Sequence, residues 1–396
     1  MYEFRVHTLV DITQNSKLQQ QFPFAGDDGE LIHNKDTLQI AKSQNSNFNT
    51  LIQLLQIRGN ITWEEPPIKI KNTLGNTAFG AYALNDDTTG QYNVAVGAYA
   101  ADAVTTGNYH TAMGYEALSA VTTANSSTAF GYQACTSVTT GVSNTGIGFR
   151  AVSAVTTGQY NTGLGYDALN GTTTASRNTA IGYACLHSSN TGARNTGVGF
   201  QVLTSNTSGQ YNTGVGDAAL EGNTTGNYNT SVGNYAADDL TTGQYNTSIG
   251  YNSNGGVTGG DYNTAIGTGS LGNNGGIGYN TAVGHNALHN VTTGYSNVAI
   301  GVDTGDTITT GMDNTYIGRH ADASANNVSF EAVLGSGTTG KGSNTANIRG
   351  NVYNSANSST FSTTSDIRIK KNIVNNNTGL DLSLIHISEP TRLLSI

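Results

Sequence analysis

The side chains that most often carry chemistry are few and scattered in this sequence. Two cysteines, Cys135 and Cys185, lie at neighbouring positions of an internal repeat, three repeats apart. Three stacked strands span about 14 Å, which exceeds the roughly 7 Å Cα separation of a disulfide, so both are interpreted as small core residues. His285 and His289 have the i, i+4 spacing that places two ligands on one helix face. In a solenoid this spacing spans a corner, so no metal site is expected there.

Carboxylates offer no better candidate for catalysis. Those in the middle of the chain stand in polar sequence that is typical of solvated turns, and they include Asp86, Asp87, Asp238, Asp239, Asp303 and Asp306. They lack the Gly-Gly-x-Gly-x-Asp pattern of calcium-binding repeats, and no pair of them predicts the two carboxylates of a glycosidase. We therefore expect no enzyme acting on an external substrate, no cofactor and no metal.

Tyrosine has a more regular spacing. Eight tyrosines share one position of the repeat: Tyr92, Tyr109, Tyr160, Tyr211, Tyr228, Tyr245, Tyr262 and Tyr279. Rings stacked one repeat apart can stabilise a roll through ring contacts. They could also present flat apolar faces to sugar rings, so these residues are the candidate surface contacts. Both interpretations stay open.

The repeat that positions these side chains is 17 residues long. Sixteen glycines, from Gly80 to Gly335, follow one another every 17 residues without insertion or deletion. The consensus of the unit is N-T-A-I-G-Y-x-A-L-x-x-x-T-T-G-x-Y. Counted from its first glycine as position 0, position −1 is always apolar, and Asn at −4 and Thr at −3 each occur in thirteen units. The tyrosine column lies at −5.

A 17-residue unit predicts a β-solenoid. It is shorter than the roughly 33 residues of a helical-pair repeat, and it fits two short strands and two turns. Glycine supplies the positive φ of a tight turn, and Asn and Thr-Gly are typical of the second turn. One unit has too little core to fold alone, whereas stacked units bury a continuous core. Stacking at the strand spacing predicts a rod about 70 Å long.

Alternation within the expected strand suggests which of its faces is buried. The bulky residue at −1 and the residue at −2 point to opposite faces, and −2 is Ala, Gly or Ser in fourteen of sixteen units. We expect the bulky residue inside the roll and the small residue on a flat outer side that packs against sister chains. The pattern alone leaves a homotrimer and a monomeric solenoid both open.

Composition and charge exclude several classes of protein. Of 396 residues, 11% are charged, and the formal net charge is −9 with 17 Lys and Arg. Nucleic-acid binding needs clustered positive charge, so it is not expected. No segment approaches the roughly 20 apolar residues of a membrane helix, and two cysteines exclude a disulfide-stapled scaffold. Residues 73–343, the repeat shaft, hold 5 Lys and Arg, 15 Asp and Glu, and none of the four prolines.

The N-T-A-I-G-Y-x-A-L motif resembles the head of the trimeric autotransporter adhesins, the YadA-like heads, over residues 73–340. The resemblance implies a left-handed parallel β-roll, three chains side by side, and an adhesive role. The unit in this chain is a few residues longer than is usual in that family, so its long turn is enlarged. The expected fold class is thus mainly β, a trimeric parallel β-solenoid of sixteen 17-residue repeats with a small α+β N-terminal domain.

That N-terminal domain is expected over residues 1–72, attached to a larger particle. A helix is predicted over 36–58, with Asp36 and Gln39 as a capping box. Its apolar face comprises Phe48, Leu51, Ile52 and Leu55. Strand-like runs flank it at 4–12 and 61–70. The chain opens with a charged, mixed stretch instead of an apolar signal-peptide core, which argues against a standard secreted adhesin.

The C-terminal part changes character after an expected neck at 344–364. Residues 365–373, Ser-Asp-Ile-Arg-Ile-Lys-Lys-Asn-Ile, resemble the start of the endosialidase-type intramolecular chaperone of phage tail fibres and tailspikes. In that family a Ser and a Lys five residues later form an autoproteolytic dyad. The resemblance assigns the dyad to Ser365 and Lys370, with cleavage between Thr364 and Ser365. A desolvated Lys can deprotonate a Ser nucleophile. The alternative interpretation is a basic strand that caps the solenoid.

Residues 382–396 do not read as natural protein sequence. Residues 382–392 resemble the conceptual translation of a sequencing-library adapter, so we leave 382–396 out of the fold. Residues 365–381 are then a truncated start of the chaperone. Because that segment lacks the scaffold of the full domain, we expect no self-cleavage by this chain.

These features predict a structural, adhesive virion protein, a trimeric phage tail fibre that binds a host-cell receptor. Its expected partners are further copies of itself, a baseplate or other tail protein, and a surface receptor, with a glycan as one candidate. Nucleic acid and membrane insertion are not expected. One alternative is a bacterial trimeric adhesin on the cell surface, and another is an ice- or glycan-binding β-solenoid. A glycan-degrading tailspike would need paired carboxylates in a groove, which the regular shaft does not offer.

Overall fold

The computed structural model describes residues 75–350, apart from 189, 257, 274, 276 and 277, and four strand segments before them. Several predictions therefore lie outside the described residues. They concern the Ser365 and Lys370 dyad, the segment 382–396, the neck beyond 350, and most of the N-terminal domain.

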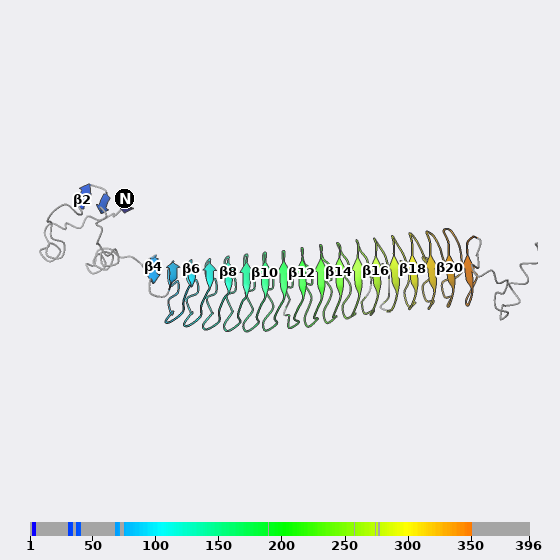
Figure 1. The fold of residues 1–396 in the computed structure, drawn as a ribbon, viewed down its shortest axis with the longest axis horizontal. Coiled ribbons are helices and arrows are strands. Elements are labelled where there is room, and N and C mark those ends of the chain that lie inside the picture. The colour runs from blue at the N-terminus through cyan, green and yellow to red at the C-terminus, as the bar shows by residue number, and fades with distance from the viewer. Residues whose placement is uncertain are drawn as a thin grey trace, which may run out of the picture.

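The shaft is a single ladder of short parallel strands that follow one another in chain order (Figure 1). Consecutive strands pair in register one unit apart up to β20, so that Thr162 lies opposite Thr179 and Leu164 opposite Ile181, and the last pair is 14 residues apart, with Ala332 opposite Ala346. The strands of the ladder are β5 (Asn76–Phe79), β6 (Val94–Val96), β7 (Thr111–Met113), β8 (Thr128–Phe130), β9 (Thr145–Ile147), β10 (Thr162–Leu164), β11 (Thr179–Ile181), β12 (Thr196–Val198), β13 (Thr213–Val215), β14 (Thr230–Val232), β15 (Thr247–Ile249), β16 (Thr264–Ile266), β17 (Thr281–Val283), β18 (Val298–Ile300), β19 (Thr315–Ile317), β20 (Ala332–Leu334) and β21 (Ala346–Ile348). The predicted β-solenoid is confirmed, and its last strand extends it past residue 343.

The first strand of the ladder is covered by an antiparallel neighbour. β4 (Ile68–Lys71) pairs with β5, with Ile68 opposite Phe79. An exposed strand edge invites pairing with other chains, so β4 closes the N-terminal edge of the solenoid.

The other described strands form a small antiparallel sheet in the order β1-β3-β2. They are β1 (Tyr2–Phe4), β2 (Leu31–Asn34) and β3 (Thr37–Ile40). The helix predicted over 36–58 is wrong at its start, because Thr37–Ile40 is the central strand of this sheet. Pairing on both sides with other segments of the chain outweighed the local capping-box pattern. The rest of that prediction lies outside the described residues.

Each coil contains one strand of three or four residues, whereas the sequence suggested two. The second expected strand is replaced by a zigzag of left-handed residues, as at Glu116 (φ 54°) and Leu118 (φ 55°). Their amides still bond to adjacent coils: Glu116 donates to the Ala98 carbonyl and Leu118 to that of Ala134, both at 3.0 Å. The segment keeps the inter-coil hydrogen bonds of a strand without its extended backbone.

The repeated glycine has the positive φ that was predicted, between 127° and 144° in every unit. A second requirement comes from the neighbouring coil. A Cβ atom on Gly114 would collide with the carbonyl oxygen of Gly131, the same position one coil later. Glycine is therefore needed for close stacking as well as for the turn.

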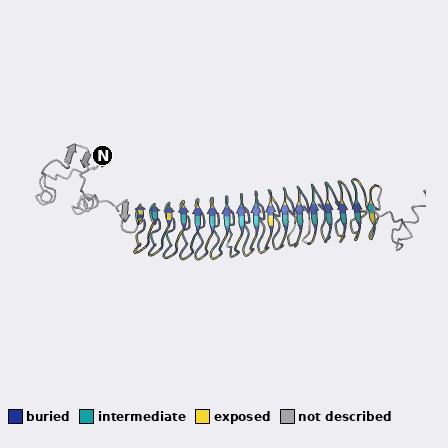
Figure 2. Ribbon diagram, in the orientation of Figure 1, coloured by how far each residue is buried: buried dark blue, intermediate teal, exposed yellow. Residues whose placement is uncertain are grey.

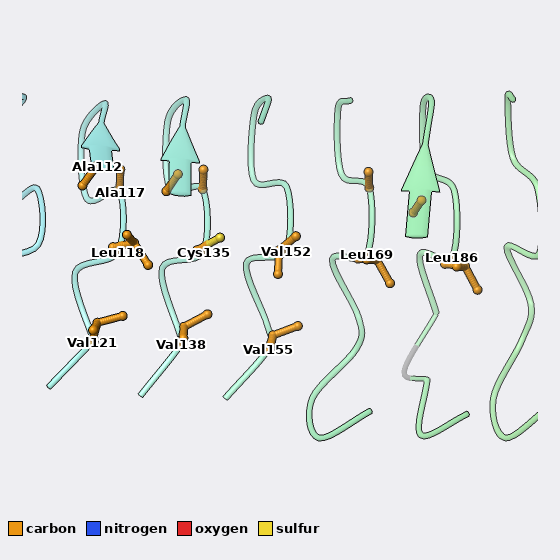
Figure 3. Packing of buried hydrophobic residues seen from close by; sticks show 14 of the residues in the cluster. Ala112, Ala117, Leu118, Val121, Cys135, Val138, Val152, Val155, Leu169 and Leu186 are labelled. Atoms are coloured by element: carbon orange, nitrogen blue, oxygen red, sulfur yellow. The ribbon is translucent and has the colours of Figure 1, made fainter. Parts of the chain in front are cut away.

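The core is a set of columns that run along the inside of the solenoid (Figure 2). Figure 3 shows several neighbouring coils, and in one of them Ala112 at −2 on β7 lies beside Ala117 at +3 and Leu118 at +4 of the returning segment. Val121 at +7 lies below Leu118 in the same coil and extends its buried interior. All four side chains are fully buried.

The expected orientation of the strand is wrong. The small residue at −2 faces inward, while the bulky residue at −1 faces out: Ala129 is buried and Phe130 is 52% exposed. The reason is the space inside the coil, which the +4 side chains already fill. A Cβ atom on Gly163 would lie 2.6 Å from Cγ2 of Val152. Only a small residue fits between the strand and that column.

Buried asparagines at −4 join each coil to the next. The Oδ1 of Asn144 accepts the backbone N–H of Asn161 at 3.0 Å, and its Nδ2 donates to the Gly158 carbonyl at 2.8 Å. Asn161 repeats both bonds one coil later. Because each side chain satisfies backbone groups that would otherwise be buried without partners, the column links the coils along much of the shaft.

Candidate functional surface

The outward side of the strand ladder is the first candidate surface. The bulky residues at −1 form an exposed apolar column, which includes Phe79, Phe130, Ile147, Leu164, Val232, Ile249, Ile266, Ile300 and Ile317. Position −3, mostly Thr, points to the same side because side chains alternate along a strand. The ladder therefore presents two straight outward columns, one apolar and one of Thr, at a spacing of one coil.

A second exposed column consists of stacked aromatic rings at +1. It runs through Tyr115, Tyr132, Phe149, Tyr166, Tyr183 and Phe200, with ring centroids 4.8 to 5.5 Å apart. We did not single out this column from the sequence, although Tyr at +1 of the consensus is the pattern that would have revealed it.

The tyrosines at −5 stack in two runs. Tyr92 and Tyr109 form one pair, with centroids 5.4 Å apart. Tyr211, Tyr228, Tyr245, Tyr262 and Tyr279 form a continuous stack with centroids 4.7 to 5.1 Å apart and planes within 12° of parallel. These are the ring contacts expected by one of the two interpretations of the sequence. Stacked rings cover each other's faces, so within a run only ring edges and hydroxyls reach solvent. Glycan contact by these residues stays a prediction.

Tyr160 stands between Ser143 and Arg177 in its column, so neither neighbouring coil carries a tyrosine there. Instead of a tyrosine, Arg177 follows it on the next coil, with its guanidinium carbon 6.0 Å from the Tyr160 ring centroid. Arg194 occupies the same position one coil later, and its guanidinium carbon lies 5.0 Å from the ring centroid of Tyr211. Two arginines on adjacent coils thus occupy the −5 column between two tyrosines. Their shared position 17 residues apart is visible in the sequence, but we had not identified it there.

Charge along the shaft is uneven around this arginine pair. Residues 117–216 hold three arginines and a single acidic residue, Asp167, whereas the rest of 73–343 holds 14 Asp and Glu against two Lys and Arg. Asp167 Oδ1 lies 3.8 Å from Nε of Arg150. Within the described residues, no ion pair joins Arg177 or Arg194 to a carboxylate.

The two cysteines and the histidines that the structure describes make separate contacts. His285 Nδ1 lies 3.4 Å from Asp303 Oδ1, while His289 Nδ1 bonds to the Gly269 carbonyl at 2.8 Å, so the two rings serve different contacts. No group of three His, Cys, Asp or Glu in the described part of the chain could hold a metal ion. Cys135 and Cys185 are free and buried, and burial raises the pKa of each thiol to about 12.

Of the six aspartates expected in solvated turns, Asp87 is buried instead. Asp87 is buried and occupies the +7 column, where it accepts hydrogen bonds from Asn76 Nδ2 at 2.7 Å and from the Gly90 amide at 2.9 Å. It satisfies backbone and side-chain donors at the first coil, which is a structural role.

Comparison with known proteins adds no family to this picture. No family model matches the chain, and no curated protein is significantly similar to it. Among the described residues, no helix is long and apolar enough to cross a membrane.

Proposed function

We propose that this chain is a structural, adhesive protein of a virion, a homotrimeric tail fibre whose solenoid shaft contributes to binding of a host-cell receptor. The N-terminal segment attaches it to a baseplate or another tail protein. The family resemblance of residues 365–373 supports a C-terminal chaperone that assembles the trimer and then cleaves itself. The chain itself is not an enzyme toward an external substrate.

The observation that carries this proposal is the outward apolar column of the strand ladder. Its side chains are held in a straight row, and several of them are 37 to 52% exposed in the single chain. Contiguous exposed apolar surface marks an interaction site. A second and third copy in the same register would cover the row from end to end, because each chain repeats every 17 residues. An unrelated globular partner would cover only part of it.

The test is the mass in solution of residues 1–364 followed by a complete chaperone domain of the type that residues 365–373 resemble. Light scattering should give three times the mass of the cleaved chain. A denaturing gel should show the released fragment, and Ser365→Ala should abolish its release. A cleaved trimer that binds bacterial cells and competes with virion adsorption would support the whole proposal.

Matched variants locate the interface. Ile249 and Ile300 point outward from strands three coils apart, and Thr242 and Thr293 are exposed on the corresponding turns. The pair Ile249→Lys and Ile300→Lys should convert the trimer to monomer, because it places charges in the apolar contact. The pair Thr242→Lys and Thr293→Lys adds the same charge and should leave the trimer intact. A monomer before any substitution would contradict the proposal.

Ice binding is a second candidate, favoured by the Thr column. Thr at −3 and the apolar residue at −1 lie on one outward face at regular spacing. In the single chain this face is more exposed to solvent than the sequence suggested. This function requires the face to stay uncovered in a monomer. Thermal hysteresis in a monomeric sample, lost in the Ile249→Lys and Ile300→Lys variant, would favour it over the fibre.

A further inference from the structure

We propose that Arg177 and Arg194 form a binding site for an oxyanion, a carboxylate or phosphate, carried by a surface saccharide. The inference rests on the proposed receptor-binding role and names the chemistry that the shaft would recognise. It concerns a pair of residues that lies outside the tyrosine contacts predicted from the sequence.

The two arginines are held side by side by the coil geometry. They occupy the same position on adjacent coils, so their backbones are about one strand spacing, 4.8 Å, apart. Their amides bond one coil back, Arg177 to the Gln159 carbonyl at 2.9 Å and Arg194 to the Ser176 carbonyl at 3.1 Å. Both side chains are exposed. The solenoid therefore fixes where the two side chains start and aims both toward solvent.

Aromatic rings bound the pair on each side. Arg177 lies over Tyr160 and Arg194 over Tyr211, and such cation–π contacts restrict where a guanidinium group can move. A guanidinium over a ring keeps its N–H groups at its edge, where they can donate to an oxyanion. Arg177 lies toward the preceding coil and Arg194 toward the following one, so an oxyanion between the two coils would accept from the inner edge of each guanidinium group.

The surroundings lack the groups that would neutralise this pair. Like charges on adjacent coils repel, and Asp167, the one acidic residue of 117–216, lies beside Arg150 instead. The acidic parts of the shaft lie outside this hundred-residue belt, and charges beyond about 8 Å are largely screened at physiological salt. A bound anion would relieve the repulsion that no side chain in the described part of the chain relieves.

Small neighbours leave access to the pair. The residues that precede the arginines are Ser176 and Ala193, whereas Gln159 and Gln210 stand at this position on the flanking coils. Less side-chain bulk therefore stands beside the guanidinium groups than beside the neighbouring tyrosines. A sugar ring bearing the anion can approach the shaft there.

The experiment measures binding of three oligosaccharides of equal length to the full chain by calorimetry. The probes are a galacturonic acid hexamer, maltohexaose carrying phosphate monoesters, and unmodified maltohexaose. We expect at least one charged probe to bind and the neutral probe to bind at least tenfold more weakly. Affinity should fall as salt is raised from about 50 to about 300 mM. The preferred charged probe distinguishes a carboxylate from a phosphate source.

Arg177→Gln with Arg194→Gln should lower the affinity about tenfold or more, and each single change should have a smaller effect. Arg319→Gln removes an exposed arginine elsewhere on the shaft and should leave binding unchanged. The proposed site is wrong if the double variant binds the charged probe as tightly as the unsubstituted chain does. It is also wrong if the unsubstituted chain binds the neutral and charged probes equally. The proposal also fails if the double variant changes the oligomeric mass but not the affinity for the probes, because the arginines would then serve contacts between chains. If neither charged probe binds, while the unsubstituted chain is a trimer that Ile249→Lys with Ile300→Lys converts to monomer, the anion site is refuted and the proposed fibre stands.

Discussion

Gly305 leaves the space that the ring of Tyr316 fills. Gly305 stands at +4, where most coils carry a large apolar residue, and Tyr316 stands at −2 of the next coil, where most carry Ala, Gly or Ser. A Cβ atom on residue 305 would lie 3.0 Å from Cδ2 of Tyr316 and 2.8 Å from Cδ2 of Leu288. The preceding coils show the usual arrangement, with Leu288 at +4 and Ala299 at −2. The two departures from the consensus thus compensate in volume.

We expect these two positions to be strongly coupled. Tyr316→Ala should lower the free energy of unfolding by about 3–5 kcal/mol through the cavity it leaves, and Gly305→Leu should lower it by about 1–3 kcal/mol through overpacking. The double variant restores the Leu and Ala pair, and the left-handed backbone at 305 (φ 66°) is one that Leu288 also adopts (φ 52°). Its stability in urea denaturation should therefore exceed that of either single variant. Additive losses would show that the two sites are independent.

His110 replaces an asparagine of the buried column and makes both of its hydrogen bonds. Nε2 lies 2.7 Å from the Ala124 carbonyl, and Nδ1 accepts the Ser127 amide at 3.3 Å. The ring must be neutral, with its proton on Nε2, for both bonds to form. Burial lowers the pKa of the His110 imidazole below its usual value.

Stability should consequently fall as the pH is lowered. Below about pH 6.5 the unfolded chain binds a proton at this residue, while folded His110 resists protonation, so the loss accumulates until the pH reaches the lower pKa of the folded state. His110→Asn should remove this contribution, and thermal midpoints measured between pH 7.5 and 5 should vary less than in the wild type. His187→Asn, at a partly exposed position, is the control and should keep the wild-type difference. An unchanged pH profile in His110→Asn would refute the assignment.

Asn254 interrupts the apolar core. One buried apolar cluster ends at Leu240 and the next begins at Ala265. Between them Asn254 stands at the +4 position, fully buried, and within the described residues neither Oδ1 nor Nδ2 has a hydrogen-bond partner. Its φ of 56° matches that of Leu118 at the same position.

Asn254→Leu should stabilise the shaft by about 1–3 kcal/mol, because it removes unsatisfied polar atoms and continues the leucine column. Thermal unfolding followed by circular dichroism measures the gain. Asn234→Leu, the same change at an exposed position, should have little effect. A lower melting temperature for Asn254→Leu would show that the amide has a partner that stabilises the native coil.

The two thiols report on opening of the solenoid. Burial raises the pKa of Cys135 and Cys185 to about 12, so at pH 8 both are protonated and shielded from reagent. A chromogenic disulfide reagent should react slowly with the native chain and with both thiols at once in denaturant. Fast reaction of one cysteine under native conditions would show that its coil opens separately from the rest.

The sequence by itself determined the repeat and the consequences of a strict period. Sixteen glycines spaced 17 residues apart predict coils of equal length, and equal coils place like positions in columns. The parallel ladder, the need for glycine at position 0 and the stacking of the −5 tyrosines were therefore predictable from spacing. Local patterns were weaker evidence: residues 37–40 fit the start of a helix but form a strand, because two other segments pair with it.

Only the tertiary structure decided which side of the strand is the core. Alternation separates Ala129 from Phe130 but does not say which faces inward. The answer depends on the +4 side chains of the returning segment, such as Val152 opposite Gly163, which leave room for a small residue alone. The same packing places the apolar −1 column on the outside. The stacking of the coils also brings Arg194 next to Arg177 on the exposed surface. Periodicity sets which residues share a column, whereas the volume inside the coil sets which columns meet solvent.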